Sequence, residues 1–176
     1  MIVKFLTLIR GVDILVTISV EGFGDIKLEL DKEHAPITAA NFEKLAKEGF
    51  YDGLTFHRIY KGFMIQGGCP LGNGTGGSDE NIKGEFAANG VNNPISHTRG
   101  TISMARSQNP NSASSQFFIC DADATFLDGN YAAFGKVTEG LDVLDRIASV
   151  PVKANPYSGE MSTPLTQPVI EKITVE

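Results

Sequence analysis

The chain is 176 residues long with 41% hydrophobic and 20% charged residues, which suits a single globular domain with a substantial core. Its formal net charge is −6, so it lacks the overall positive field that attracts nucleic acid or anionic membranes. We therefore expect a protein that binds neither. The 19 glycines are scattered along the chain, which indicates many turns and favours a mainly β protein.

The N-terminal segment is apolar enough to raise the question of a targeting sequence. Its run from Phe5 to Ile9 is interrupted by Arg10 and then by Asp13. A secretory signal needs roughly 7–15 consecutive apolar residues, and a membrane helix needs about 20. We expect residues 1–12 to be a variable leader, residues 1–176 to form one domain, and the protein to be cytoplasmic.

The first half of the chain predicts a hairpin, a helix and two further strands. Residues 13–30, DILVTISVEGFGDIKLEL, alternate in polarity around a Gly-containing turn. Residues 34–50, HAPITAANFEKLAKEGF, change to helical spacing, with Pro36 in the first turn and Gly49 at the end. The strand candidates LTFHRIY and GFMIQGG follow, and then a Gly-rich loop over residues 69–84.

The second half predicts four strands and one more helix. The strand candidates are GTISMAR, SSQFFICDA, YAAFGKVT and the C-terminal VIEKITVE. Helical spacing returns in residues 139–150, EGLDVLDRIASV, and we expect residues 151–168 to be a loop. Many short strands with two helices predict a closed antiparallel barrel whose open ends the helices cover.

One motif imitates a nucleotide-binding site. Gly72, Gly74 and Gly77 in GNGTGG satisfy the pattern G-x-G-x-x-G. That pattern binds a pyrophosphate when it joins a strand to a helix. Here it is followed by SDENIKGEF, which is not an amphipathic helix. We interpret the segment instead as a close-packed loop at the rim of a groove.

Other common chemistries find little support. There is no G-x-S-x-G elbow, and His34, His57 and His97 lack the spacing of zinc ligands. Cys69 and Cys120 are too few and too far apart for a disulfide scaffold, so we expect free thiols. A Cys–His pair stays open at this point. We expect no metal and no cofactor.

Isolated polar residues interrupt the most apolar strands. Residues two apart on a strand share a face, so Gln66 should lie beside Met64, and Gln116 beside Phe118. Arg58 lies before a glycine bend that could bring it to the same surface. This pattern predicts an apolar pocket with a guanidinium and amides at its edge. The alternative is that Arg58 is an ion-paired barrel residue and that the glutamines lie on the surface.

The motifs together resemble a known family. The segments FHRIYKGFMIQGG, GNGTGG, GTISMAR, SSQFFIC and FLDGNYAAFGKVTEGLDVLD occur in the order and spacing of the cyclophilin-type peptidyl-prolyl cis-trans isomerases. The resemblance runs from about Asp13 to the C-terminus and is weakest over residues 150–168. It implies an eight-stranded antiparallel β-barrel capped by two helices. It also implies rotation of X-Pro peptide bonds without a covalent intermediate or cofactor.

The resemblance also assigns roles to residues of this chain. It implies a catalytic group of Arg58, Phe63 and Gln66, in which the guanidinium stabilises the twisted bond. It implies that the substrate contacts Met64, Gly74, Ala105, Arg106, Gln116, Phe118, Phe126, Leu127 and Tyr131. The partners would be proline-containing peptides and unfolded or folding proteins. The sequence does not fix the oligomeric state, and a monomer is the simplest expectation.

Three residues depart from the best-known eukaryotic pattern of the family. Phe126 stands where Trp is usual, Tyr131 where His is usual, and Arg106 where Asn is usual. Loss of the indole N–H predicts that any cyclosporin-like ligand is bound only weakly. Arg106 adds charge beside the groove, which predicts an altered sequence preference. The alternative to an enzyme is a proline-binding module without turnover, and a third possibility is an isomerase regulated through Cys69 and Cys120.

Overall fold

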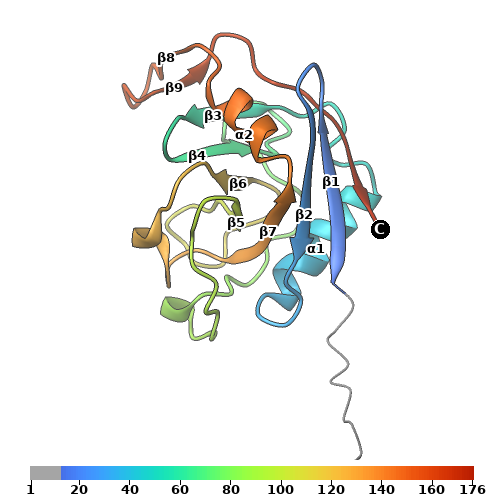
Figure 1. The fold of residues 1–176 in the computed structure, drawn as a ribbon. Coiled ribbons are helices and arrows are strands. Elements are labelled where there is room, and N and C mark those ends of the chain that lie inside the picture. The colour runs from blue at the N-terminus through green and yellow to red at the C-terminus, as the bar shows by residue number, and fades with distance from the viewer. Residues whose placement is uncertain (1–12) are drawn as a thin grey trace, which may run out of the picture.

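The structure is a computed structural model that describes residues 13–176. Eight antiparallel strands form one sheet in the order β10-β1-β2-β7-β5-β6-β4-β3, and this sheet curves around a core (Figure 1). The predicted leader over residues 1–12 lies outside the described residues. The strands of this sheet are β1 (Ile14–Val20), β2 (Gly24–Leu30), β3 (Phe56–Tyr60), β4 (Met64–Gly67), β5 (Thr101–Met104), β6 (Phe117–Cys120), β7 (Ala133–Glu139) and β10 (Ile170–Val175).

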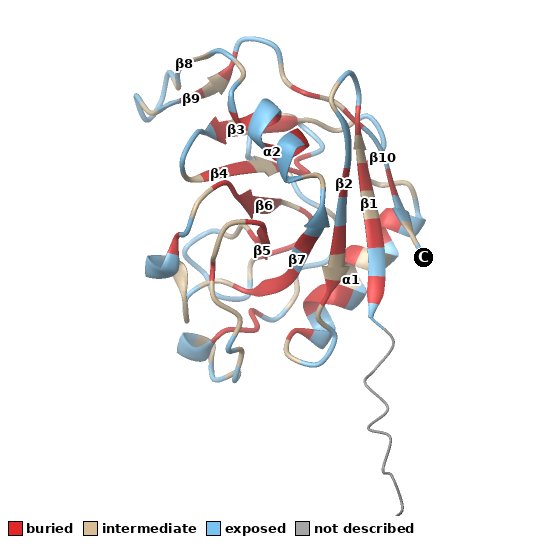
Figure 2. Cartoon of the chain, viewed as in Figure 1, coloured by how far each residue is buried: buried red, intermediate tan, exposed pale blue. Residues whose placement is uncertain are grey.

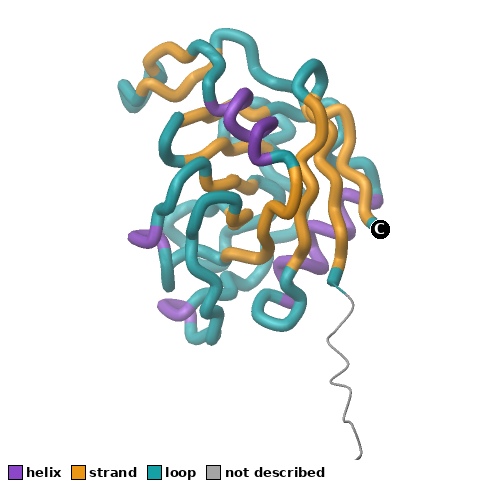
Figure 3. The backbone as a smooth tube through the Cα atoms, in the orientation of Figure 1, coloured by secondary structure: helices purple, strands orange, loops and turns teal. Residues whose placement is uncertain are grey.

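Helices cover the sheet where the sequence predicts them. Helix α1 (Pro36–Lys47) lies against β10 and β7, and α2 (Leu141–Ala148) lies against β2, β3 and β4 (Figure 3). Two short 3-10 helices, η1 (Ala87–Asn89) and η2 (Thr125–Leu127), were not predicted. Among residues 13–176, no helix is long and apolar enough to cross a membrane.

The eight-stranded antiparallel architecture is confirmed, but the prediction of a closed barrel overstates it. The edge strands β3 and β10 meet only through an isolated bridge, Thr55 with Val169, and neighbouring backbone hydrogen bonds such as Ile170 N to Leu54 O at 2.7 Å. Register within the predicted hairpin is regular, with Val16 opposite Leu28. The barrel is therefore incompletely closed between its first and last edges.

Alternation gives the central strands two apolar faces. Ile65 and Phe117 pack in the main core, whereas Met64 and Phe118 belong to a second, smaller cluster on the other face. β4 and β6 pair antiparallel, which places Gln66 opposite Phe118. Figure 2 shows that these strands are almost wholly buried. The second face is the one available for a site.

The expected loop over residues 151–168 is partly wrong, because it contains a small hairpin. Strands β8 (Val152–Ala154) and β9 (Met161–Pro164) pair antiparallel in a separate two-stranded sheet (Figure 1). β9 lies against β3. These strands have the short sequences VKA and MSTP, which lack the run of alternating β-branched residues that signals a strand.

A distant carboxylate caps helix α1. Ala35 at the N-cap position carries no side-chain acceptor, and Pro36 occupies the first helical position. Glu85, which is only 2% exposed, accepts hydrogen bonds from the backbone N of Thr38 at 2.6 Å and of Ile37 at 3.2 Å. The Thr38 hydroxyl donates to the same carboxylate at 2.7 Å. The loop after residue 84 is thereby fastened to the helix.

We predict that Glu85→Ala lowers the free energy of unfolding by about 2–3 kcal/mol, since it leaves buried N–H donors unpaired at a helix N-terminus. The measurement is urea unfolding followed by circular dichroism. Glu80→Ala is the control, because Glu80 is an exposed carboxylate 3.7 Å from Lys44 and such pairs contribute little. Equal midpoints for Glu85→Ala and the wild type would contradict the capping role.

Candidate functional site

The second apolar face lines a cavity. It has a volume of about 190 Å³ and lies where β3, β4 and β6 meet the loops that follow β5 and β6. Nine of the predicted site residues line it: Arg58, Phe63, Met64, Gln66, Ala105, Arg106, Phe118, Leu127 and Tyr131. The structure therefore brings these nine residues together around one cavity, and their roles stay predictions.

The walls of this cavity are largely apolar. Met64 and Phe118 are buried and form its floor, and Tyr131 packs edge-on to Phe118 with ring centroids 6.0 Å apart. The ring centroids of Phe63 and Phe126 lie 5.5 Å apart. Phe126 is 72% exposed, and it lines neither this cavity nor the neighbouring polar cavity described below. Phe126 is thus a rim residue, not a wall of the cavity.

Hydrogen bonds link the three polar residues singled out in the sequence. Strand pairing sets Arg58 opposite Gln66, and Arg58 Nη1 donates to Gln66 Oε1 at 3.3 Å. Gln66 Nε2 then donates to Gln116 Oε1 at 3.0 Å. Gln116 Nε2 donates in turn to the carbonyls of Gly74 and Gly76, at 3.0 and 2.7 Å. Each amide is therefore oriented by the next group along this series.

The other partner of Arg58 is a residue that the sequence did not indicate. Glu160 accepts from Arg58 Nε at 2.8 Å and from Nη2 at 2.9 Å, in a bidentate pair. The hydrogen bond from Arg58 lowers the pKa of Glu160, so this carboxylate is ionised at neutral pH. Arg58 is thus ion-paired, as the alternative interpretation expected, and it also lines the cavity.

A second, more polar cavity of about 370 Å³ adjoins the first. Gln66, Ala105 and Arg106 line both. Arg106 donates to the backbone carbonyl of Asn130 and lies over the Tyr131 ring, 4.8 Å from its centroid. The other lining residues carry hydroxyls, amides or no polar side chain: Gly74, Thr75, Gly76, Gly77, Ser78, Asn81, Ser107, Ser112, Ser114 and Gln116. Arg106 therefore brings the charge of this cavity.

The predicted rim role of the glycine-rich loop agrees with this arrangement. Gly74 and Gly77 line the polar cavity, and no helix follows the motif before η1. Gly74 has φ +86°, and a Cβ there would meet His57 Nε2 at 3.3 Å, so a side chain would be strained and crowded. The loop thus brings its backbone close to the groove.

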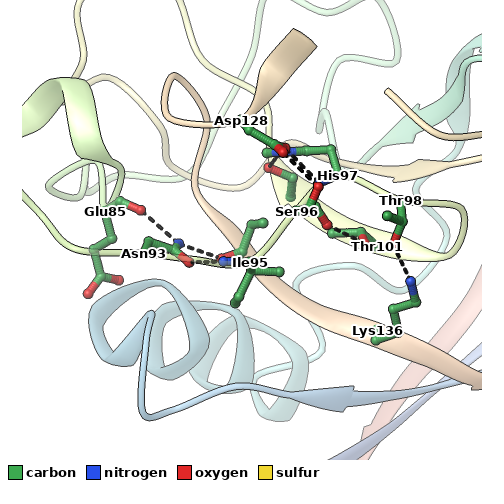
Figure 4. Close-up of polar contacts among 11 residues, drawn as sticks. Glu85, Asn93, Ile95, Ser96, His97, Thr98, Thr101, Asp128 and Lys136 are labelled. Atoms are coloured by element: carbon green, nitrogen blue, oxygen red, sulfur yellow. Dashed lines mark hydrogen bonds and ion pairs between the residues drawn. The ribbon is translucent and has the colours of Figure 1, made fainter. Parts of the chain in front are cut away.

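A buried network supports the cavity floor from behind. His97 Nδ1 lies 2.8 Å from Asp128 Oδ1, and its Nε2 lies 2.9 Å from Ser103 Oγ. Asp128 also accepts from Ser96 Oγ at 2.6 Å (Figure 4). The His97 ring stacks on the Phe118 ring, with 6.0 Å between the ring centroids and an interplanar angle of 18°. His97 and Ser103 are fully buried, so this Ser–His–Asp arrangement cannot reach a substrate.

The remaining sequence hypotheses concern thiols and metals. Cys69 and Cys120 are both free, as predicted, and the structure shows that both are buried. Burial raises the pKa of Cys120 to about 12, which makes its thiol unreactive at neutral pH. Within residues 13–176, no group of three His, Cys, Asp or Glu side chains is placed to hold a metal ion.

Comparison with known proteins agrees with this geometry. The model of the family described as cyclophilin type peptidyl-prolyl cis-trans isomerase/CLD matches residues 15–175. A Helicobacter pylori peptidyl-prolyl cis-trans isomerase is 52% identical over 126 residues, covering 70% of this chain and 74% of the relative. A Bacillus subtilis peptidyl-prolyl cis-trans isomerase B is 52% identical over 117 residues, covering 66% of this chain and 78% of the relative.

Solved structures extend the likeness to the fold. A Cryptosporidium parvum cyclophilin type peptidyl-prolyl cis-trans isomerase superposes with a TM-score of 0.82 at 30% identity, covering 93% of this chain and 98% of that one. A second structure of that protein, in the presence of the dipeptide Ala-Pro, has a TM-score of 0.81. The chain described here belongs to the cyclophilin-type peptidyl-prolyl cis-trans isomerase family. Its activity is the cis-trans isomerisation of peptidyl-prolyl bonds.

We predict that His57 makes the fold sensitive to mild acid. Burial, and then the charge of Arg58, lowers the pKa of His57 from 6.5 to about 4. Between these two values the unfolded chain binds a proton that the folded chain does not. The free energy of unfolding should therefore carry no penalty from His57 above pH 6.5. It should fall as the pH drops towards 4, by at most about 1.4 kcal/mol per pH unit.

The test is denaturant unfolding of the wild type and His57→Gln between pH 7 and 4.5. The loss of stability over this range should be smaller in the variant. It should not vanish, because burial also lowers the pKa of His97. His34→Gln is the control, since the hydrogen bond that His34 Nδ1 donates to the Asp31 carboxylate raises the pKa of His34, and its effect has the opposite sign. Identical pH profiles for wild type and His57→Gln would contradict the prediction.

Proposed function

We propose that this enzyme acts on exposed X-Pro bonds in peptides and in unfolded or folding proteins, as a cytoplasmic monomer. The observation that carries the proposal is that the apolar residues Met64 and Phe118 and the guanidinium of Arg58 line the same cavity. The related Cryptosporidium structure in the presence of Ala-Pro supports a proline-containing ligand here. In this proposal Met64, Phe118, Phe63 and Leu127 grip the pyrrolidine ring.

The reaction requires a twisted amide, not a broken bond. Rotation about an X-Pro bond forfeits resonance and meets a barrier of roughly 20 kcal/mol. As the bond twists, the prolyl nitrogen becomes pyramidal and regains its lone pair. A guanidinium directed at that nitrogen stabilises the electron density, and it stays protonated at any working pH. In this proposal Arg58, which lines the cavity and donates to Gln66, supplies that guanidinium, and Gln66 orients it and binds the substrate backbone.

The transition-state stabilisation that the reaction requires is within the range that such a site can supply. An acceleration of about 10⁵-fold corresponds to roughly 7 kcal/mol of transition-state stabilisation. One charge-assisted hydrogen bond in a partly apolar cavity supplies part of this, and binding of a twisted conformer supplies more. Neither contribution needs a nucleophile, a metal or a cofactor.

The polar cavity would take substrate residues that precede the proline. Gly74, Ala105, Arg106 and Gln116 would border this subsite, with backbone groups of residues 105 and 106 pairing with an extended peptide. Phe126 and Tyr131 would complete the rim on the proline side. Because Phe126 offers no N–H donor, we propose that cyclosporin-like macrocycles bind only weakly.

We predict that Arg58→Ala lowers kcat/KM for a short X-Pro peptide by at least about 100-fold, or about 2.7 kcal/mol of transition-state stabilisation. Catalysed exchange between cis and trans forms is measured by NMR. Arg146→Ala is the matched control, because Arg146 lies on α2 and donates to the Phe23 carbonyl. Binding shifts without accelerated exchange in the wild type would instead indicate a proline-binding module without turnover.

We predict that Arg106 favours acidic peptides. Two peptides that differ only in Glu or Lys near the X-Pro bond are compared at low salt. The wild type should show the higher kcat/KM for the Glu peptide, and Arg106→Asn should reduce the ratio by about 2- to 5-fold. Salt should reduce the same ratio in the wild type. A ratio unchanged by the substitution would show that Arg106 does not contribute to selectivity.

A further inference from the structure

The Glu160 carboxylate accepts hydrogen bonds along one edge of the Arg58 guanidinium. An arginine carries five N–H donors. Glu160 accepts from Nε at 2.8 Å and from Nη2 at 2.9 Å, and Gln66 accepts from Nη1 at 3.3 Å. The two remaining N–H groups, one on each terminal nitrogen, have no protein partner within residues 13–176. They belong to a side chain that lines the apolar cavity.

The hairpin β8–β9 holds this carboxylate in place. Asn155 N donates to the Glu160 carbonyl at 2.7 Å, and Gly159 N donates to the Asn155 carbonyl at 2.8 Å. The Asn155 side chain accepts from Tyr157 N and Ser158 N, at 2.8 and 3.1 Å. β9 begins at the next residue and lies against β3, the strand that carries Arg58. The carboxylate is therefore presented by a braced turn.

From this geometry we propose that Glu160 is a positioning residue: it fixes the plane of the Arg58 guanidinium so that the two remaining N–H groups face the prolyl nitrogen of the substrate. The inference rests on the role proposed above for Arg58. It gives a function to a segment, residues 155–160, in which the sequence showed no motif.

Orientation is the effect that a carboxylate can add here. The ion pair is partly exposed, with 37% of the Arg58 side chain and 29% of the Glu160 side chain accessible. A neighbouring negative charge weakens the positive field of a guanidinium, so it would not help catalysis through charge alone. A bidentate pair does restrict the many rotamers of a long side chain. The donors then need no reordering when the amide twists.

The test is a double-mutant cycle in kcat and KM. Glu160→Gln keeps the size of the side chain but replaces one acceptor with a donor that faces the guanidinium. We expect kcat to fall by about 10-fold while KM changes by less than about twofold. In the Arg58→Ala background the same substitution should cause no further loss, because there is no guanidinium left to position. Glu160→Asp, which keeps a carboxylate, should lose less.

A direct readout and controls complete the experiment. In NMR spectra the Arg58 Nε–H resonance should shift or broaden in Glu160→Gln, because the donor loses its charged acceptor. Tyr157→Ala changes the same hairpin at a side chain that is 98% exposed, and Glu171→Gln removes an exposed carboxylate on β10. Both control variants should retain the kcat of the wild type.

The outcomes separate this inference from the proposed role of Arg58. If Arg58→Ala retains full activity, the role of Arg58 is wrong and that of Glu160 falls with it. If Arg58→Ala loses activity but Glu160→Gln does not, only the positioning role is overturned. A higher kcat in Glu160→Gln, an equal loss in both backgrounds, or an unmoved Nε–H resonance overturns it as well.

Discussion

Strict alternation of side chains along β4 and β6 is the constraint on which both the core and the site depend. Ile65 and Phe117 point into the main core, so Met64 and Phe118 must point to the opposite face. A slip of one residue in the pairing would exchange the two sets and bury Gln66 in the core. Packing of large apolar residues on one face therefore also fixes the register of the cavity on the other.

Polar side chains can lie beside these apolar faces because each one is hydrogen-bonded to the next. Glu160, Arg58, Gln66 and Gln116 form a continuous series that ends at backbone carbonyls of the glycine-rich loop. Leaving any of these groups without a partner in a partly buried place would cost free energy. The same bonds that reduce this cost also orient Arg58 and the amides. Stability and preorganisation of the site thus have a common physical origin.

The parts of the molecule that were predictable from sequence are those with a local signal. Period-two alternation predicted the hairpin of β1 and β2, and Pro36 with helical spacing predicted α1. Residues of the site on β3, β4 and β6 followed from polar interruptions in apolar strands and from the resemblance. In contrast, Glu160 lies 102 residues from Arg58 in a segment without alternation, so only tertiary structure brings the two together.

The same lack of a local signal explains the other differences between the predicted and the observed structure. Closure of the barrel depends on how β3 meets β10, and no local pattern specifies a contact between elements so distant in the chain. The capping of α1 by Glu85 had no signal either, because the acceptor comes from 47 residues away. Sequence patterns therefore predicted the eight strands of the main sheet, the two α-helices and one face of the site, whereas long-range polar contacts became visible only in the fold.

The buried Ser103–His97–Asp128 arrangement shows why residue types alone do not define a reaction. Burial lowers the pKa of His97, so its ring is neutral at physiological pH, and the ring stacks on Phe118 at the cavity floor. A hydrolase would expose such a serine to attack a carbonyl. Rotation about a prolyl bond breaks no covalent bond and transfers no proton. The network is therefore structural: its His97 ring packs on Phe118, a residue that lines the cavity.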